Sequence, residues 1–410
     1  MAIKGYRALF VFINTLIFSM ASKTILGFVK TQNLVDSIER SLTMNKKERF
    51  QAVREKRSPD FMPVWPRVQS QMLFSYGYRL PEVTGQDWYD SDKVTAAVLK
   101  SIKEIDYDMA IPSYVDYGFG VPPLGGKIWI PDKFGVAAGT SDDQPVKTKA
   151  DWPRVKKMMA TYDVKKKDPR MAGCLEVMKN VSASVGDEMP LVPMYYVGTT
   201  AAMFLFRPNE AFLEDLFEDP AWVKDMVEVA TDWAIDWISA QYDAGANSIC
   251  FTAETMGTLM MSPKMCEEFN LPCIKKLVDE VRKRHGQATW LHIHGNMQTP
   301  KAYDYLTKLV KEAGVEGFHF DENCPADWIK REVVDKLGTP ACIITDGAAI
   351  AKGPVEKIDE AVKNDMAKIG DGLGLMMAPS CQVLPATSNE HFKAWVDATH
   401  KYGKYPLNKK

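Results

Sequence analysis

Short apolar runs alternate with longer amphipathic stretches along most of this chain. Eight of the short runs have the length and the β-branched or aromatic content of buried strands. They are residues 63–68, 109–115, 191–197, 248–253, 289–294, 317–320, 341–345 and 375–378. The helical period is clearest in 221–242, 262–284, 354–369 and 389–402. Alternation of this kind predicts parallel strands joined by crossover helices, and eight units predict an α/β fold of the (β/α)8 barrel type.

One internal segment, residues 118–148, does not follow this alternation. It lacks a helical period and contains Pro122-Pro123, Gly125-Gly126 and the β-rich run 127–130. We expect a hairpin-bearing insertion after the second strand, because irregular segments of this kind often form the wall of a barrel mouth.

Residues 1–43 are predicted to be an apolar N-terminal extension, and residues 44–410 are assigned to the barrel. The basic start, the apolar run 8–21 and the small residues Ser19-Met20-Ala21 resemble a signal peptide or a membrane anchor. A non-functional or misannotated extension and an ordinary packing helix are the other two interpretations. The polar helix start at Met44 favours a domain that begins there.

Composition excludes several classes of protein. A chain of 410 residues with 46% hydrophobic and 25% charged residues can bury one large core. A net charge of -2 without Lys/Arg blocks excludes an electrostatic nucleic-acid surface. Seven scattered cysteines do not form a disulfide framework, so we expect a reduced, cytoplasmic protein. The apolar N-terminal run is too short to predict a membrane-spanning protein.

The candidate chemistry lies in Trp290-Leu-His-Ile-His-Gly-Asn296 and, far downstream, in Met377-Ala-Pro-Ser-Cys381. Side chains alternate along a strand, so His292 and His294 should project to the same face. Two imidazoles and one thiolate can bind zinc, and three protein ligands leave one position open, as in catalytic zinc sites. We therefore predict a zinc ion held by His292, His294 and Cys381.

Acidic side chains follow several of the other predicted strands. In a barrel these positions meet at the carboxyl ends of the strands, where active sites lie. The residues are Asp116, Glu254, Asp321, Glu322 and Asp346. Helix capping and ion pairs are the alternative roles of Asp321 and Asp346. Cys381 alone could also be a small buried hydrophobe.

From about Met44 to Pro406 the chain resembles the uroporphyrinogen decarboxylase superfamily, and within it the zinc-dependent methyltransferases that act on corrinoid proteins and thiols. The matching stretches are Met44-Asn-Lys-Lys-Glu-Arg49, Pro63-Val-Trp-Pro66, Gly245-Ala-Asn-Ser-Ile249, Met261-Ser-Pro-Lys-Met265, Leu271-Pro272, His292-Ile-His-Gly-Asn296 and Ala378-Pro-Ser-Cys-Gln-Val-Leu-Pro385. The resemblance implies that His292 and Cys381 are zinc ligands. His294 stands where that branch has a cysteine, which leaves a metal more electropositive.

This resemblance implies a methyl transfer between a corrinoid protein and a small thiol or a methylated small molecule. Glu254 and Asp346 are then assigned to catalysis. Glu254 would complete the resting coordination or orient a ligand, and Asp346 and Asp321 would hydrogen-bond to a histidine. Tyr114, Asp116 and Asn296 are assigned to cofactor binding at the barrel mouth.

Two other functions remain open from the sequence. The decarboxylase branch has a Gly-Arg-Tyr-Leu-Pro-Glu stretch near its first strand. This chain has the similar stretch Gly77-Tyr-Arg-Leu-Pro-Glu82, in which Tyr78 and Arg79 are transposed. Cys381 stands where that branch has a histidine. Such an enzyme needs several arginines for a porphyrinogen, whereas only Arg67 and Arg79 lie in this region. A non-catalytic barrel that binds a corrinoid or tetrapyrrole is the third interpretation.

Overall fold

Six parallel strands form the central sheet of the folded unit Lys46–Lys410. The computed structural model describes residues 44–253, 260–286 and 289–407. The strands follow one another in sequence order across the sheet, and each pairs in parallel with the next. They are β3 (Met194–Tyr196), β4 (Ile249–Ala253), β5 (Thr289–Ile293), β6 (Gly317–His319), β7 (Ala341–Thr345) and β8 (Leu375–Pro379). The prediction of an α/β fold with a parallel sheet is confirmed.

The first two predicted strands are not regular strands, so the prediction of eight is wrong in this respect and the regular sheet is not a closed barrel. Residues 63–68 and 109–115 each contribute an isolated parallel bridge, Val64 to Met377 and Ala110 to Leu191. Proline lacks the N–H that a ladder needs, and Pro63, Pro66 and Pro112 lie in these segments. The segments still border the sheet through hydrogen bonds such as Trp65 N–H to the Met377 carbonyl, 2.9 Å.

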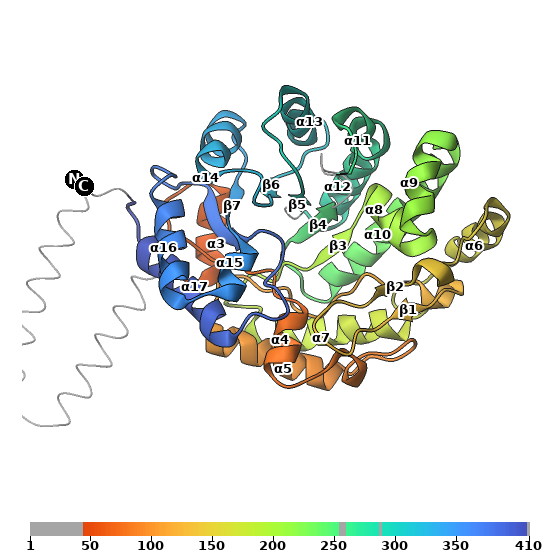
Figure 1. The fold of residues 1–410 in the computed structure, drawn as a ribbon, viewed down its shortest axis with the longest axis horizontal. Helices are drawn as coiled ribbons and strands as arrows, with labels where there is room; N and C mark the ends of the chain where they lie inside the picture. Colours follow the sequence, from red (N-terminus) through yellow and green to blue (C-terminus); the bar gives the residue numbers. More distant parts are fainter. Residues whose placement is uncertain (1–43, 254–259, 287–288, 408–410) are drawn as a thin grey trace, which may run out of the picture. The chain divides into compact units, whose positions relative to one another are not determined.

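Helices surround the strands, which lie side by side in the middle of Figure 1. The α-helices before β4 are α3 (Lys46–Arg54), α4 (Ser70–Ser75), α5 (Ser91–Ile105), α6 (Trp152–Met159), α7 (Pro169–Val185), α8 (Gly198–Phe206), α9 (Asn209–Glu218) and α10 (Pro220–Asp243). Those after β4 are α11 (Pro263–Phe269), α12 (Leu271–His285), α13 (Pro300–Lys311), α14 (Ala326–Trp328), α15 (Gly347–Lys352), α16 (Val355–Met366) and α17 (Asn389–Tyr402). A π-helical segment, η5 (Ile329–Lys336), continues α14. Short 3-10 turns are η1 (Leu80–Glu82), η2 (Pro122–Leu124), η3 (Ser141–Asp143) and η4 (Lys149–Asp151).

The predicted helix 262–284 is divided into α11 and α12 at Asn270. Pro272 explains the break, because proline in a helix interior removes a backbone hydrogen bond and clashes with the preceding turn. It instead occupies the first turn of α12, where a missing N–H costs nothing. The predicted helices 221–242, 354–369 and 389–402 correspond to α10, α16 and α17.

The predicted insertion carries a short antiparallel hairpin of β1 (Ile128–Trp129) and β2 (Ala138–Gly139). The hairpin is attached to the chain before α5, since the Gln86 side chain donates to the Ile128 carbonyl at 2.7 Å and accepts from the Ile128 N–H at 3.1 Å. The prediction of a hairpin in this segment is confirmed.

One apolar cluster lies beneath the predicted histidines. Trp290 of β5 packs in it with Trp65, Cys250, Cys342 and Met376, which come from different strands and bordering segments. Gly317 of β6 leaves room for the indole, because a Cβ there would lie 2.4 Å from the ring of Trp290. The face of β5 that carries Trp290 also carries His292, two residues further along.

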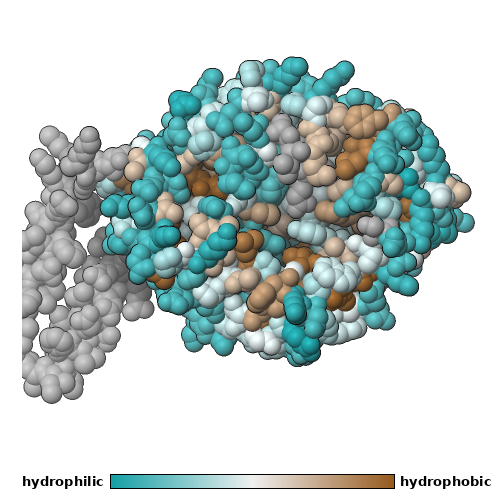
Figure 2. Space-filling view, in the orientation of Figure 1, coloured by the Kyte–Doolittle hydropathy of each residue, from teal (hydrophilic) through white to brown (hydrophobic). Residues whose placement is uncertain are grey.

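The surface in Figure 2 is mostly hydrophilic toward its edge, with hydrophobic residues nearer the middle. Among the residues that the structure describes, no helix combines the length and the apolar character needed to cross a bilayer. The predicted extension 1–43 lies outside the described residues, and the cytoplasmic location stays a prediction.

Candidate metal centre

The three predicted zinc ligands converge. The nearest donor atoms of His292, His294 and Cys381 all lie within 4.8 Å of one another. His292 is on β5, His294 directly follows it, and Cys381 follows β8. His292 is fully buried, whereas His294 and Cys381 are half-buried. The structure therefore brings one imidazole from the interior and two more accessible donors to one point.

In both His292 and His294, one ring nitrogen has a hydrogen-bond partner and the other has none among the described residues. Nδ1 of His292 lies 3.1 Å from the carbonyl oxygen of His319, and Nδ1 of His294 lies 3.3 Å from Oδ2 of Asp321. Both Nε2 atoms are buried and have no hydrogen-bond partner within the described ranges. Metal-binding histidines have this arrangement, because an acceptor at one nitrogen leaves the lone pair of the other for the metal. The donor set therefore fits zinc.

The two histidines differ in charge state. Burial, the nearby Arg67 guanidinium and His319 hold the pKa of His292 well below its usual range. Burial also acts to lower the pKa of His294, but hydrogen bonding to Asp321 and the neighbouring Cys381 outweigh it and raise that pKa to about 10. Without a metal, His292 is therefore neutral and His294 is protonated at neutral pH.

Asp321 is held in place beside His294. Its Oδ2 accepts a hydrogen bond from the Gly295 N–H at 2.7 Å, and its Oδ1 accepts from the Asn323 N–H at 3.0 Å. Burial opposes ionisation of this carboxyl, but the contacts with His294 and the two N–H groups lower its pKa. Asp321 thus has the position of a carboxylate that orients a metal-binding histidine.

Arg67 is a fully buried cation at the centre. Its Nη1 donates to the Cys381 carbonyl at 2.9 Å, and its Nη2 lies 3.3 Å from Oγ1 of Thr252. Among the described residues, Nε has no hydrogen-bond partner and no carboxylate pairs with this guanidinium. The backbone of Arg67 has a φ of 48°, which is a strained conformation for a residue other than glycine.

Three other predicted site residues are not part of this group of donor atoms in the structure as described. Glu254 lies outside the described residues. Asp346 is exposed and caps α15 by accepting a hydrogen bond from the Ala348 N–H at 2.9 Å, the alternative role that its position suggested. Asn296 is exposed, and its Oδ1 accepts from the Gln298 N–H at 2.8 Å. The assigned catalytic and cofactor roles of these residues stay predictions.

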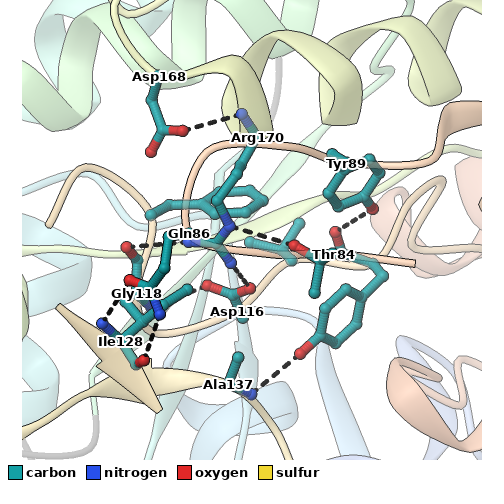
Figure 3. A network of polar contacts seen from close by, with 12 residues as sticks. Thr84, Gln86, Tyr89, Asp116, Gly118, Ile128, Ala137, Asp168 and Arg170 are labelled. Atoms are coloured by element: carbon teal, nitrogen blue, oxygen red, sulfur yellow. Dashed lines mark hydrogen bonds and ion pairs between the residues drawn. The ribbon is translucent and has the colours of Figure 1, made fainter. Parts of the chain in front are cut away.

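Tyr114 and Asp116 belong to a separate buried network. Figure 3 labels Asp116, Gly118, Ala137 and Arg170 of this network. Asp116 pairs with Arg170 of α7 and accepts a hydrogen bond from the Gly118 N–H at 2.9 Å. The Tyr114 hydroxyl accepts from the Ala137 N–H at 3.0 Å. Burial raises the pKa of Asp116 to about 6, although the Arg170 charge opposes this shift. These contacts join the hairpin insertion to α7, and the assignment of both residues to cofactor binding stays a prediction.

His319 was not among the residues predicted from the sequence to form the centre, and Arg67 was predicted only as a possible residue for decarboxylation. In the β5–β6 register, His292 is opposite His319. The signal was the period-two pattern Gly317-x-His319-x-Asp321, which repeats the pattern Trp290-x-His292-x-His294 of the neighbouring strand. It becomes readable only when the two strands are known to be neighbours in this register.

Comparison with known proteins agrees with this architecture. Residues 45–402 match the family model described as uroporphyrinogen decarboxylase (URO-D). A methylcobamide:CoM methyltransferase of Methanosarcina barkeri is 23% identical over 269 residues, which are 64% of this chain and 74% of that protein. A uroporphyrinogen decarboxylase of Pseudoalteromonas translucida is 20% identical over 373 residues, which are 87% of this chain and 97% of that protein.

A solved structure described as a methyltransferase from Methanosarcina mazei superimposes with a TM-score of 0.70 at 20% identity, covering 88% of this chain and 99% of the other. This likeness supports the fold. Because the family model spans most of the chain, the protein belongs to the uroporphyrinogen decarboxylase family. The relatives include both methyltransferases and decarboxylases, so membership alone does not choose between the two activities.

Proposed function

We propose that this protein is a zinc-dependent methyltransferase that moves a methyl group between a corrinoid (methylcobamide) protein and a thiol or other small acceptor. The observation that carries the proposal is the convergence of His292, His294 and Cys381, whose donor atoms lie within 4.8 Å of one another. Relatives named methylcobamide:CoM methyltransferases support the choice of donor and acceptor class.

The chain's own residues have distinct parts in this function. Nε2 of His292, Nε2 of His294 and the sulfur of Cys381 would hold the zinc. When bound, zinc supplies Lewis-acid chemistry, which lowers the pKa of a thiol so that its thiolate forms near neutral pH. Asp321 orients His294 by accepting the proton on its Nδ1. His294 must release the proton on its other nitrogen before it can bind a metal.

Arg67 supports an anionic ligand at this centre. Its buried guanidinium has neutral hydrogen-bond acceptors but no carboxylate partner within the described part of the chain. A buried cation without a counter-ion is costly, and a thiolate nearby would lower that cost. The same site serves transfer in the opposite direction, from a methylated small molecule to a corrinoid.

Porphyrinogen decarboxylation is the alternative outcome. That activity requires several cations for the carboxylates of a tetrapyrrole, but only Arg67 of the two predicted arginines lies at the centre. Arg79 is exposed and pairs with Glu82 at 2.9 Å and Asp132 at 2.9 Å. The site therefore favours methyl transfer.

The test is the zinc content of the purified full-length protein after dialysis, compared with His292→Ala and Cys381→Ala. His285→Ala is a matched control, because His285 lies at the end of α12 and stacks on Tyr242. We expect about one zinc per chain in the wild type and the control, little in the two ligand variants, and methylation of a thiol by methylcobalamin only where zinc is present. A folded wild type without zinc that decarboxylates uroporphyrinogen would overturn the proposal.

A further inference from the structure

We propose that His319 is a positioning residue that fixes the tautomer of His292 and so presents Nε2 of His292 to the metal. One proton lies between the two imidazoles, and its role in metal binding rests on the zinc site proposed above. His319 has no part in that proposal as a ligand.

Strand register brings the two rings together. His292 of β5 and His319 of β6 are direct partners in the parallel ladder. Their ring centroids are 4.5 Å apart with an interplanar angle of 73°. Trp65 packs edge-on against His319, with 5.6 Å between ring centroids, and both side chains are fully buried. The ring of His319 is therefore confined by its neighbours.

The distance between the rings limits where protons can lie. Nδ1 of His319 and Nδ1 of His292 are 2.7 Å apart, which is a hydrogen-bond distance. A neutral imidazole has one donor nitrogen and one acceptor nitrogen. Two N–H groups at this distance would clash, and two lone pairs would repel. One of the two Nδ1 atoms carries a proton and the other accepts it.

Two further contacts decide which nitrogen carries the proton. The backbone carbonyl of His319 can only accept, and its oxygen lies 3.1 Å from Nδ1 of His292. The Arg67 guanidinium can only donate, and its Nη1 lies 3.5 Å from Nδ1 of His319. Both contacts favour a proton on His292 Nδ1 and a lone pair on His319 Nδ1.

The consequence is a free lone pair on Nε2 of His292. That atom is buried and lacks a hydrogen-bond partner among the residues described. In the other tautomer Nε2 would carry the proton and could not bind a metal. His319 contributes two acceptors to the correct tautomer, its own carbonyl and its ring nitrogen, and Arg67 keeps the ring nitrogen in the accepting role.

His319 is better placed to orient a ligand than to be one. Among the described residues, the group of donor atoms that lie within 4.8 Å of one another contains His292, His294 and Cys381 but not His319. Nδ1 of His319 is already directed at His292. Partners that orient a metal-binding histidine typically change metal affinity by about 10–100-fold when they are removed.

The first measurement is the 15N spectrum of the metal-free, histidine-labelled full-length protein. The chain has six histidines, so the ring signals can be assigned, with His292→Gln identifying those of His292. Protonated and unprotonated ring nitrogens have well separated 15N shifts. We expect His292 to carry its proton on Nδ1. A proton on Nε2 would overturn the proposal.

The second measurement compares His319→Asn with His319→Leu. The amide oxygen of asparagine can replace Nδ1 as an acceptor, whereas leucine fills the space without one. By competition with a chelator, we expect zinc affinity to fall about 10–100-fold in His319→Leu and to be largely restored in His319→Asn. Equal losses in both variants would indicate a merely structural role and overturn the proposal.

The two proposals fail in distinguishable ways. A folded wild type that binds no zinc overturns the methyltransferase proposal, while the 15N spectrum still reports the tautomer of His292. A wild type that binds zinc with the opposite tautomer in its metal-free form overturns only the role of His319.

Discussion

Two buried polar clusters in this protein differ in how completely their polar atoms are paired. In the insertion network, Arg170 donates through Nε to Thr84 at 3.2 Å, through Nη1 to the Gly118 carbonyl at 3.2 Å and through Nη2 to Asp116. At the candidate metal centre, within the described residues, Nε of Arg67 and Nε2 of His292, His294 and His319 are buried without hydrogen-bond partners.

This difference in pairing distinguishes a polar cluster that stabilises the fold from one that is suited to bind a ligand. Buried polar groups in native proteins are nearly always hydrogen-bonded, because an unpaired one costs about 1–3 kcal/mol. The insertion network meets this rule through its own residues and joins a hairpin to a helix (Figure 3). The candidate metal centre departs from this rule, because several of its buried polar atoms have no hydrogen-bond partner among the described residues. These atoms are imidazole nitrogens, which can bind zinc, and a guanidinium nitrogen, which can bind an anion. Four substitutions test this contrast.

The largest effect is expected for Cys381→Ala. Loss of one of three protein ligands should release the zinc and reduce methyl transfer by about 10³-fold, since a metal contributes several kcal/mol of transition-state stabilisation. Elemental analysis and a methylcobalamin assay measure both quantities. Cys273→Ala is the control. Cys273 is buried within α12, so this variant should retain its zinc. Full activity in Cys381→Ala would contradict the metal site.

Arg170→Met should instead reduce stability and spare the metal. It leaves the buried Asp116 without its cation, whereas Asp168 keeps its hydrogen bond from the backbone N–H of residue 170, and breaking a buried ion pair costs about 3–5 kcal/mol. Urea unfolding measures the loss, with the exposed Arg331→Met as control. Zinc bound per folded chain should not change. Loss of zinc in a folded variant would show that the two clusters are coupled.

Asp321→Asn should weaken zinc binding without abolishing it. The amide cannot orient or charge-stabilise His294 as the carboxylate does, so affinity should fall about 10–100-fold. The variant also tests pH dependence. Because the pKa of His294 is about 10 in the metal-free wild type, its proton must leave when zinc binds, so affinity should rise about tenfold per pH unit between pH 7 and 9.

The raised pKa of His294 also predicts how the stability of the metal-free protein changes with pH. The metal-free protein gains stability from protonated His294 below the unfolded-state pKa of about 6.5, and that gain disappears as pH rises toward 10. Unfolding measurements across this range should show the decline in the wild type and a smaller one in Asp321→Asn. An identical profile in both proteins would contradict the role assigned to Asp321.

The smallest effect is expected for Asp346→Ala. The substitution removes the cap of α15 and should cost about 1 kcal/mol of stability. If capping is its whole role, methyl transfer per folded chain will not change, and the predicted catalytic role of Asp346 will be wrong. A large loss of activity at normal stability would support that role instead.

Local patterns in the sequence predicted a large part of this architecture. Alternating apolar runs identified the segments of β3 to β8, and helical periods identified α10, α16 and α17. They failed at residues 63–68 and 109–115, where prolines reduce predicted strands to single bridges. They gave no sign of the partner of Asp116, because a carboxylate after a predicted strand shows nothing about the arginine, Arg170, that lies opposite it in space.

The sequence by itself determined that His292 and His294 share a face, since strand side chains alternate with a period of two. Only the tertiary structure decided that Cys381 joins them, that His319 lies opposite His292, and that Arg67 has no carboxylate partner among the described residues. The physical reason is that periodicity is a local property of the backbone. Register and packing, by contrast, depend on contacts between distant segments that no single segment encodes.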